Sequence, residues 1–365
     1  MSVRVCHVAS NHYVTDGRVF KRECKSLAKK YDVSLIVPNV PSGVVEGINV
    51  IGVELPSQRL KRMVSLRPVK EAAIKVDAEV YHFHDPELLP IAKEIKKLGK
   101  KVIFDSHEDM PADILEKPYI PLYLRKLISY SYEKYEKRVL RNLDALVTVT
   151  PKIVERLKKI NPRTYLITNY PIYREIEHKN ARKKQICFTG LISHIWKQDK
   201  IVESLEGLDV KYVIAGPMTS EYQSYLEKLG GWKQVDYRGV VSSDAAQEIQ
   251  TNSIAGMALL GYSPIVGGKE GTLGNTKLFE YMMAGTPVIA SDLNLWKAII
   301  SKYDCGLCVC PDNTEDIAKA IRFMLENPDI VEKMGANGQR AVKAEYNWAT
   351  QESVLFDLYE EVLSL

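Results

Sequence analysis

The sequence lacks any apolar run that approaches the ~20 residues of a membrane-spanning helix. It also has no internal repeat and no low-complexity tract. The N-terminus, MSVRVCHVAS, passes almost directly into a strand-like pattern and has no apolar core of a signal peptide. These absences argue against a membrane-spanning or secreted protein, and we therefore expect a cytoplasmic one.

Two nucleotide-binding signatures are also missing. No Gly-x-Gly-x-x-Gly joins a strand to a helix, which argues against a nicotinamide enzyme. No Gly-x-x-x-x-Gly-Lys-[Ser/Thr] is present, which argues against a P-loop NTPase.

Cysteine is scarce, with six residues in the chain. Cys305, Cys308 and Cys310 lie close together, but no second Cys/His pair follows at ligand spacing. The segment 306–311 also fits a short strand that ends at a proline. We therefore favour reduced, structural thiols over a metal site here, and we expect no metal.

The remaining composition is that of a soluble globular protein of two ordinary domains, with 365 residues, 45% hydrophobic and 26% charged. The net charge of +4 is unevenly distributed: residues 1–170 hold 30 Lys+Arg against 20 Asp+Glu, and the remainder holds 20 against 26. This asymmetry suggests that the first half meets an anionic surface or ligand.

Strands and helices alternate along both halves of the chain, which predicts α/β structure with parallel sheets. In the first half we expect strands at 4–9, 33–37, 48–53, 80–83, 102–104 and 145–149, and helices at 18–30, 87–98 and 151–159. In the second half we expect strands at 186–188, 211–215, 234–237, 255–259 and 287–290.

The polar connector 169–184 interrupts this alternation, so we place the domain boundary there. The prediction is two doubly wound, Rossmann-like domains, 1–170 and 171–365, facing one another across a cleft. The last helix, at about 350–363, is expected to pack back on the first domain.

The segment 271–292, GTLGNTKLFEYMMAGTPVIASD, predicts a loop, a short helix, a turn and a buried strand. Asn275 is the expected N-cap. Lys277 and Glu280 fall in the first two turns, where an open helix N-terminus and a cation suit a phosphate. An ordinary surface ion pair at i,i+3 spacing is the alternative.

Glycines follow most strands of the second half, at Gly190, Gly216, Gly239 and Gly261. In parallel sheets, ligands approach the carboxyl ends of the strands, so these positions are expected to border a binding site.

Six further segments appear in a familiar order: 16–21 (DGRVFK), 84–90 (HDPELLP), 104–109 (FDSHED), 169–171 (NYP), 215–217 (AGP) and 237–241 (YRGVV). With these and the segment 271–292, the chain resembles the bacterial family-4 retaining glycosyltransferases of the GT-B fold. The nearest relatives would act in surface-polysaccharide or lipopolysaccharide assembly.

The resemblance implies that the second domain binds the donor. Glu280 would accept the ribose hydroxyls, and Lys277, Lys197 and the amides of 274–276 would face the diphosphate. The loop 237–241 would hold the base. The expected donor-binding residues are Glu280, Gly190, Gly216, Gly239, Val240, Thr272, Gly274, Asn275, Thr276 and Leu278, and the expected catalytic ones are Lys197, Lys277 and His107.

On the first domain, the resemblance implies that His107 contacts the transferred sugar or the acceptor, whereas capping a helix is its structural alternative. His84 and Asp85 are expected to line the same cleft, and His82 to be structural. Asp16 and Arg18 are candidate acceptor contacts, with a solvated helix end as the alternative for Arg18.

The chain departs from the family pattern at two positions. Thr272 stands near the place of an expected glutamate, and Glu270 lies two residues early. Leu191 stands where the family commonly has arginine after the first strand of the donor domain.

Two basic segments, 58–67 and 119–141, mix cations with apolar and tyrosine side chains. They fit peripheral contact with an anionic membrane around a lipid-linked acceptor, with a solvated helix face as the equal alternative. The tyrosines fall on an expected helix rather than on a stacking sheet, so we expect no nucleic-acid partner.

We therefore predict a metal-independent, retaining glycosyltransferase that moves a sugar from a nucleoside-diphosphate donor to a growing, lipid-linked glycan. Two alternatives stay open: a sugar-nucleotide epimerase of the GT-B fold, and a non-catalytic nucleotide-sugar-binding subunit.

Overall fold

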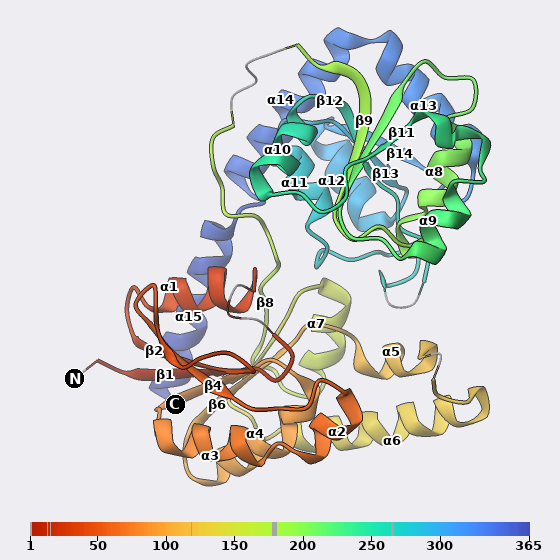
Figure 1. Ribbon diagram of the computed structural model, residues 1–365. Coiled ribbons are helices and arrows are strands. Elements are labelled where there is room, and N and C mark those ends of the chain that lie inside the picture. Colours follow the sequence, from red (N-terminus) through yellow and green to blue (C-terminus); the bar gives the residue numbers. More distant parts are fainter. Residues whose placement is uncertain (1, 13, 15, 118, 177–180, 264–265) are drawn as a thin grey trace. The chain divides into compact units, whose positions relative to one another are not determined.

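The computed structural model describes residues 2–12, 14, 16–117, 119–176, 181–263 and 266–365, without the side chains of Arg59, Leu60 and Met63. It divides into two compact units, Met1–Asn169 with Trp348–Leu365, and Tyr170–Asn347 (Figure 1). The division falls one residue before the predicted boundary. Trp348–Leu365 belongs to the first unit, so the second unit ends earlier than the predicted domain 171–365.

The first unit is built on an eight-stranded sheet of order β3-β4-β2-β1-β5-β6-β7-β8. All neighbouring strands are parallel except β3, which is antiparallel to β4. The strands are β1 (Arg4–Val8), β2 (Asp32–Pro38), β3 (Gly43–Val45), β4 (Ile48–Val53), β5 (Val80–Phe83), β6 (Lys101–Ser106), β7 (Ala145–Thr148) and β8 (Thr164–Leu166).

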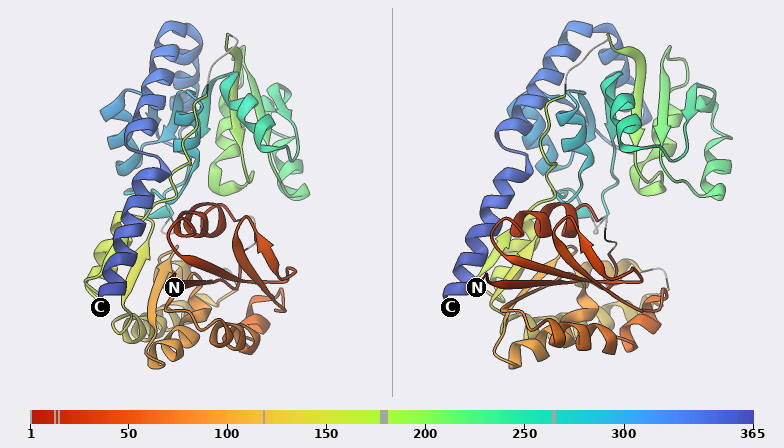
Figure 2. Two further views of the ribbon diagram at one scale, coloured as in Figure 1. Left: turned by 90° about the vertical axis from the view of Figure 1, so that its left-hand side faces the viewer. Right: turned by 60° about the vertical axis from the view of Figure 1, so that its left-hand side comes forward.

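Helices cover both faces of this sheet. They are the π-helical turn η1 (Val19–Cys24), α1 (Lys25–Leu27), α2 (Arg59–Val64), α3 (Arg67–Val76), η2 (Pro86–Leu88), α4 (Leu89–Lys97), α5 (Met110–Glu116), α6 (Leu122–Leu140), α7 (Pro151–Lys158) and α15 (Trp348–Ser364). One face packs on α3, α4, α6 and α7. The other packs on η1 and α15, whose C-terminal end lies near the start of the N-terminal strand (Figure 2).

Side chains alternate between these two faces along each strand. Cys6 and Val8 of β1 pack on the α3–α4 side, and Val5 packs on the η1–α15 side. His7 therefore shares the face of Val5. The same alternation places His82 of β5 and Asp105 of β6 on the η1–α15 side.

The second unit contains a six-stranded parallel sheet of order β11-β10-β9-β12-β13-β14. Its strands are β9 (Lys183–Thr189), β10 (Lys211–Ala215), β11 (Val235–Tyr237), β12 (Ser253–Ala258), β13 (Val288–Ser291) and β14 (Gly306–Val309). Its helices are η3 (His194–Trp196), α8 (Gln198–Ser204), α9 (Ser220–Leu226), η4 (Gly230–Gln234), α10 (Ser243–Thr251), α11 (Lys277–Met283), α12 (Asn294–Tyr303), α13 (Thr314–Glu326) and α14 (Pro328–Ala344).

The short strand expected within 306–311 is β14, and the six cysteines are free thiols. No helix in the described part of the chain combines the length and the apolarity that a bilayer span requires.

Each sheet has one point where its strand order reverses. In the first unit, β2 lies on one side of β1 and β5 on the other; in the second, β10 and β12 flank β9. Ligands of open α/β sheets bind outside the carboxyl ends of the strands at such points. The loops after β1, β5 and β6, and those after β9 and β12, are therefore the places to examine for a site.

Candidate functional site

Helix α11 begins at Lys277, and its N-cap is Thr276 rather than the predicted Asn275. The Asn275 side chain instead closes a turn, because its Oδ1 accepts a hydrogen bond from the Lys277 amide at 3.0 Å. The Thr276 hydroxyl donates to Glu280 Oε1 at 2.7 Å. The turn and the hydroxyl together fix the position of the Glu280 carboxylate at the start of the helix.

Lys277 and Glu280 form the ion pair that their spacing predicts, with Lys277 Nζ 2.7 Å from Glu280 Oε2. The pair is no ordinary surface contact, since the lysine side chain is only 16% exposed. It crosses Gly190, where a Cβ would lie 2.6 Å from Lys277 Cε. The absence of a side chain at Gly190, after β9, thus makes room for Lys277 at the start of α11. The loop after β9 and the N-terminus of α11 are therefore in contact.

Gly216, at the same edge, is also spatially required. A Cβ on Gly216 would lie 1.8 Å from the Gly190 carbonyl oxygen, and the Gly216 amide donates to the Gly239 carbonyl at 2.7 Å. These contacts bring the loops after β9, β10 and β11 together. Val240, next in the chain, is 77% exposed.

Lys197 has a left-handed backbone with φ 47°, and its Nζ contacts Asp312 Oδ1 at 2.6 Å. Its side chain crosses Gly261, where a Cβ would lie 2.7 Å from Lys197 Cε. Lys197 thus repeats, over the loop after β12, the arrangement of Lys277 over Gly190. Asp312 belongs to no motif, so sequence reasoning had no signal for this pairing.

The two departures from the family pattern have defined places. The Thr272 hydroxyl accepts a hydrogen bond from the Gly274 amide at 3.0 Å, and the Thr272 carbonyl accepts one from Trp296 Nε1 at 2.7 Å. Glu270 Oε2 accepts a hydrogen bond from Asn294 at 2.9 Å. Leu191 is 60% exposed. Both Thr272 and Glu270 therefore support the loop before α11 in this structure.

Leu278 differs from its expected place among donor contacts. Its side chain is 0% exposed and belongs to the core of the second unit, because it lies on the apolar stripe of α11. Gly274, Asn275 and Thr276 are partly exposed, as a donor contact requires.

The first unit has a cavity of about 320 Å³ at its own reversal point. His84, Asp85 and His107 line it, together with Asn11, His12, Arg62, Glu87 and Lys117 among its polar residues. His107 Nε2 lies 3.3 Å from Asp105 Oδ2 and 3.4 Å from His84 Nδ1. The Asp85 carboxylate accepts the amide hydrogens of Ser10 and Asn11 at 2.6 and 3.2 Å, which shapes the loop after β1.

Arg18 differs from both of its predicted roles. It is neither a solvated helix end nor a free acceptor contact, since it is 5% exposed. Its guanidinium contacts Asp105 Oδ2 at 2.7 Å and donates to the Ile167 carbonyl and to Asn169 Oδ1 at 2.9 and 2.7 Å. A buried cation held by these contacts acts within the fold.

Asp16 has a structural part as well. Its Oδ1 accepts the amide hydrogens of Arg18 and Val19 at 2.8 and 2.7 Å, which caps the start of η1. Burial raises the pKa of Asp16, but the hydrogen bonds from His12 and from these amides outweigh it and leave the pKa well below its usual range.

Sequence reasoning missed His12, which lies 3.1 Å from Asp16 Oδ2 through its Nδ1 and faces His107 with 5.2 Å between ring centroids. Burial lowers the pKa of His12, but Asp16, Asp85 and Asp105 together raise it above its ordinary value. The available signal was its position in the loop after β1, at the reversal point of the sheet.

Buried Arg62 and Glu87 form a further ion pair at the cavity, with 2.8 Å between Nε and Oε1. Arg62 was counted in the basic segment 58–67, but its 7% exposure removes it from any surface patch. The side chains of Arg59, Leu60 and Met63 in that segment lie outside the described residues.

Comparison with known proteins identifies this architecture. The family "Glycosyltransferase Family 4" matches residues 17–169, and the family "Glycosyl transferases group 1" matches residues 169–341. Of the curated proteins, the chain is 24% identical to "D-rhamnosyltransferase WbpZ" of Pseudomonas aeruginosa over 287 residues, 74% of this chain and 70% of that protein. It is 27% identical to "Alpha-D-kanosaminyltransferase" of Streptomyces kanamyceticus over 156 residues, 43% of this chain and 39% of that protein.

Solved structures agree at the level of the fold. The chain is similar to WaaG, "a glycosyltransferase involved in lipopolysaccharide biosynthesis", with a TM-score of 0.70 and 14% identity over 98% of this chain and 99% of that one. It is similar to Anabaena Alr3699/HepE "in complex with UDP-glucose", with a TM-score of 0.70 and 12% identity over 99% of this chain and 100% of that one.

Fold and matches together define a glycosyltransferase of the GT-B class. Within that class, the chain belongs to the family-4 glycosyltransferases. Its two family matches meet at residue 169 and together cover residues 17–341.

Proposed function

We propose that this glycosyltransferase transfers a sugar, with retention of anomeric configuration, from a nucleoside-diphosphate sugar to a growing, lipid-linked glycan of the cell surface. The observation that carries the donor assignment is the half-buried Lys277–Glu280 pair, seated over Gly190 at the reversal point of the second sheet. Among the proteins named above, the structure with UDP-glucose bound supports this class of donor, the lipopolysaccharide glycosyltransferase supports this class of product, and the rhamnosyltransferase supports sugar transfer.

The pair suits the two ends of a nucleoside diphosphate. The Glu280 carboxylate is an acceptor for the two ribose hydroxyls, which are neutral donors. The Lys277 ammonium is freed for the diphosphate when the carboxylate turns to the ribose. Lys197, released from Asp312, supplies a second cation for the same leaving group.

In the transfer, the bond between the anomeric carbon and the diphosphate oxygen breaks, and the acceptor oxygen bonds to the same face of that carbon. The acceptor proton passes to the departing diphosphate. Negative charge grows on the diphosphate as the bond breaks, so cations fixed beside it stabilise the transition state more than the bound donor. With two lysines in this role, the reaction needs no metal ion at the diphosphate.

The acceptor sugar, in this proposal, binds the polar cavity of the first unit. His107 is 23% exposed there, and its ring can accept or donate a hydrogen bond to a sugar hydroxyl. His12 and Lys117 add a titratable group and a cation to the same cavity.

The test is turnover of Lys277→Ala and Glu280→Gln, measured as nucleoside-diphosphate release from UDP-, GDP- and dTDP-sugars with a lipid-linked acceptor. Loss of one such preorganised contact is expected to lower kcat by ~10²–10³. Lys200→Ala is the matched control, since Lys200 forms an i,i+3 pair with Glu203 at 2.8 Å in the same unit, with a lysine that is 30% exposed against 16% for Lys277. Wild-type turnover in both site variants refutes the donor assignment.

Membrane contact, as part of the proposal, rests on α6. Its outer face exposes Leu122 at 77%, Tyr123 at 82% and Leu127 at 61%, interspersed with cations such as Lys126. Large apolar side chains next to cations are the composition of helices that lie on anionic bilayers. A lipid-linked acceptor is presented at such a surface.

A further inference from the structure

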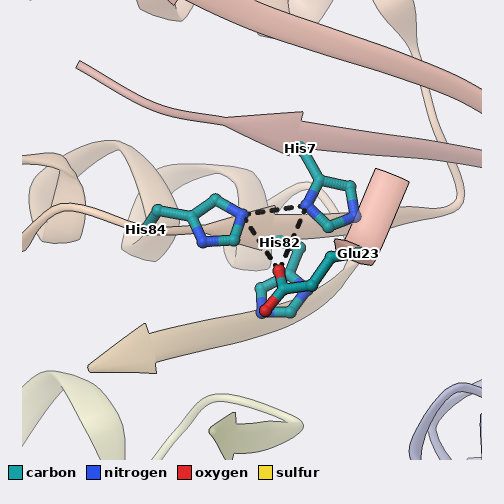
Figure 3. A group of neighbouring side chains, drawn as sticks. All are labelled: His7, Glu23, His82 and His84. Atoms are coloured by element: carbon teal, nitrogen blue, oxygen red, sulfur yellow. Dashed lines mark hydrogen bonds and ion pairs between the residues drawn. The ribbon is translucent and has the colours of Figure 1, made fainter. Parts of the chain in front are cut away.

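Four side chains with metal-ligand chemistry meet inside the first unit: His7 on β1, Glu23 on η1, His82 on β5 and His84 directly after β5 (Figure 3). Their ligand atoms all lie within 4.8 Å of one another. Three of these residues are 0% exposed and His84 is 2% exposed. His7 and His82 are register partners on neighbouring strands, and η1 covers the sheet face to which both belong.

The distances suit a small ion. His7 Nδ1 is 2.8 Å from His84 Nε2, and Glu23 Oε2 is 3.9 Å from the first nitrogen and 3.8 Å from the second. Ligand atoms around a tetrahedral zinc ion, with bonds of ~2.0–2.1 Å, lie ~3.3 Å apart. Shifts of ~0.5 Å in these side chains bring the three atoms to that spacing.

Of the atoms at the cluster, His7 Nδ1 and His84 Nε2 are within hydrogen-bond distance of each other, whereas among the described residues the carboxylate oxygens of Glu23 and the His82 Nε2 lack hydrogen bonds. Glu23 Oε1 lies 3.1 Å from Arg18 Nε, whereas Oε2 faces the imidazoles of His7 and His84. Since more than nine in ten buried polar groups are hydrogen-bonded, the unpaired His82 Nε2 and Glu23 Oε2 point to a ligand.

The opposite ring nitrogens, in contrast, have fixed neighbours. The Tyr359 hydroxyl lies 3.0 Å from His82 Nδ1 and 3.3 Å from His7 Nε2. His84 Nδ1 lies 3.6 Å from Asp105 Oδ2. Histidine ligands of metals characteristically present one nitrogen to the ion and the other to such a partner, which fixes the ring.

The charged groups beside the cluster accommodate a cation as well. One guanidinium, that of Arg18, faces the carboxyl groups of both Glu23 and Asp105, at 3.1 and 2.7 Å. A further positive charge, either a proton or a metal ion, therefore balances the second carboxylate.

We propose that His7, Glu23, His82 and His84 bind one divalent transition-metal ion of the zinc type. Three imidazoles and one carboxylate favour such an ion over magnesium or calcium, which take mainly oxygen ligands. Four protein ligands close the coordination sphere, which is the mark of a structural site. The ion joins β1, β5 and η1, and Tyr359 extends the connection to α15.

A second group, His84, Asp105 and His107, shares one ligand with this site. It is less suited to an ion because Asp105 Oδ2 is already bound by Arg18 at 2.7 Å. The proposed site belongs to the first unit and the residues assigned to the donor belong to the second, so its success or failure does not depend on the donor assignment.

The first experiment uses the full chain, free of any histidine tag and purified without chelators. Elemental analysis is expected to find about one zinc per chain, and cobalt substitution to give the visible d–d bands of tetrahedral Co²⁺. X-ray absorption at the zinc edge is expected to show nitrogen and oxygen ligands without sulfur. A chain that is folded by circular dichroism, contains no metal and takes up neither Zn²⁺ nor Co²⁺ overturns the proposal and leaves a protonated hydrogen-bond network instead.

Variants then locate the ion. Glu23→Gln and His82→Asn are expected to lose the bound zinc, and Tyr359→Phe to weaken zinc affinity by ~10–100-fold. His194→Asn is the control, since His194 packs on Tyr222 in the second unit. Zinc retained at full stoichiometry and affinity in both ligand variants refutes the assignment.

If these variants fail to fold, the wild-type chain still decides. Removal of metal by a chelator is expected to lower Tm, and added Zn²⁺ to restore it. A Tm that does not respond to either treatment contradicts the structural role.

Discussion

Gly190 shows how far one residue can control the donor site. Its φ is +145°, and a Cβ there would meet Lys277 Cε at 2.6 Å. Gly190→Ala is therefore expected to strain the backbone by ~1–3 kcal/mol and to displace the lysine, lowering turnover by ~10²-fold or more. Denaturant unfolding and nucleoside-diphosphate release measure the two effects separately.

Gly207→Ala is the matched control for that variant. Gly207 also has positive φ, +81°, but a Cβ added there would meet no atom within 4 Å. It is expected to lose stability and to keep wild-type turnover. Equal turnover in the two variants would mean that the position of Lys277 does not matter.

His12 and Asp16 make a pH-dependent contribution to stability. The pKa of Asp16 is lowered in the folded protein. Its contribution to the free energy of unfolding is therefore present above the unfolded-state pKa of ~3.9 and is lost as the pH falls towards the folded-state pKa. The pKa of His12 is raised in the folded protein. Its contribution to the free energy of unfolding is therefore complete below the unfolded-state pKa of ~6.5 and is lost as the pH rises through the folded-state pKa. Asp85, Asp105, His84 and His107 face the same imidazole.

The expected result is a stability difference between the wild type and His12→Asn that is largest at pH 4.5–6.5, a window set by roughly those two unfolded values. Denaturant unfolding from pH 4 to pH 9 measures it. A difference that grows above pH 8 would contradict the raised pKa of His12.

For individual residues, the sequence predicted contacts between neighbours in the chain. It did not predict contacts between residues that are distant in the chain and that the sheet brings together. The Lys277–Glu280 pair follows from one turn of helix. The burial of Arg18 depends on Asp105, Ile167 and Asn169, which are distant in sequence. The meeting of His7 with Glu23 depends likewise on η1 covering β1, and no local pattern encodes that contact.

Among the elements, α15 is the one whose place in the chain differs most from its place in the fold. It follows the whole second unit in the sequence but belongs to the first unit. Leu355, Leu358, Tyr359 and Val362 are all 0% exposed in the core that it shares with η1. Trp348 Nε1 donates to Ser26 Oγ at 2.8 Å.

Leu358→Ala is therefore expected to destabilise the first unit by ~2–5 kcal/mol, since it opens a cavity in a closed apolar layer. Leu365→Ala, at a side chain that is 54% exposed, is expected to change stability by less than ~0.5 kcal/mol. Denaturant unfolding, followed by a probe in each unit, measures both. An unchanged first-unit transition in Leu358→Ala would refute the role of α15.

Alternation of apolar runs predicted most strands to within a residue or two, because buried parallel strands are short, continuous apolar segments. The strands β3 and β8 were missed, since each has three residues and β3 is exposed along its length. The expected helix 18–30 is mainly the π-helical turn η1, whose widened turn brings Glu23 towards the histidines and is invisible to periodicity alone.

For the whole molecule, the location of α15 changes how charge is divided between the two units. The chain's net charge is +10 over residues 1–170, but α15 adds four carboxylates and no cation to the first unit. The first unit then holds 30 cations against 24 carboxylates, and the second 20 against 22. The excess of positive charge is thus smaller than the sequence suggests, so a local patch and not the total must attract an anionic surface.

If α6 is that local patch, membrane contact depends on its own cations. Lys126→Glu with Lys137→Glu, both on the exposed side of α6, is expected to weaken binding to phosphatidylserine vesicles by roughly 10-fold or more, at ~1 kcal/mol per cation near the surface. Lys228→Glu with Lys233→Glu makes the same change of net charge at exposed positions of the second unit and is expected to leave binding unchanged.

Tyr123→Ser with Leu127→Ser is expected to weaken binding even at high salt, where screening has removed most of the charge attraction. Vesicle co-sedimentation over a salt series separates the two contributions. Equal loss in the α6 and second-unit charge variants would show that net charge alone is responsible and that α6 has no special part.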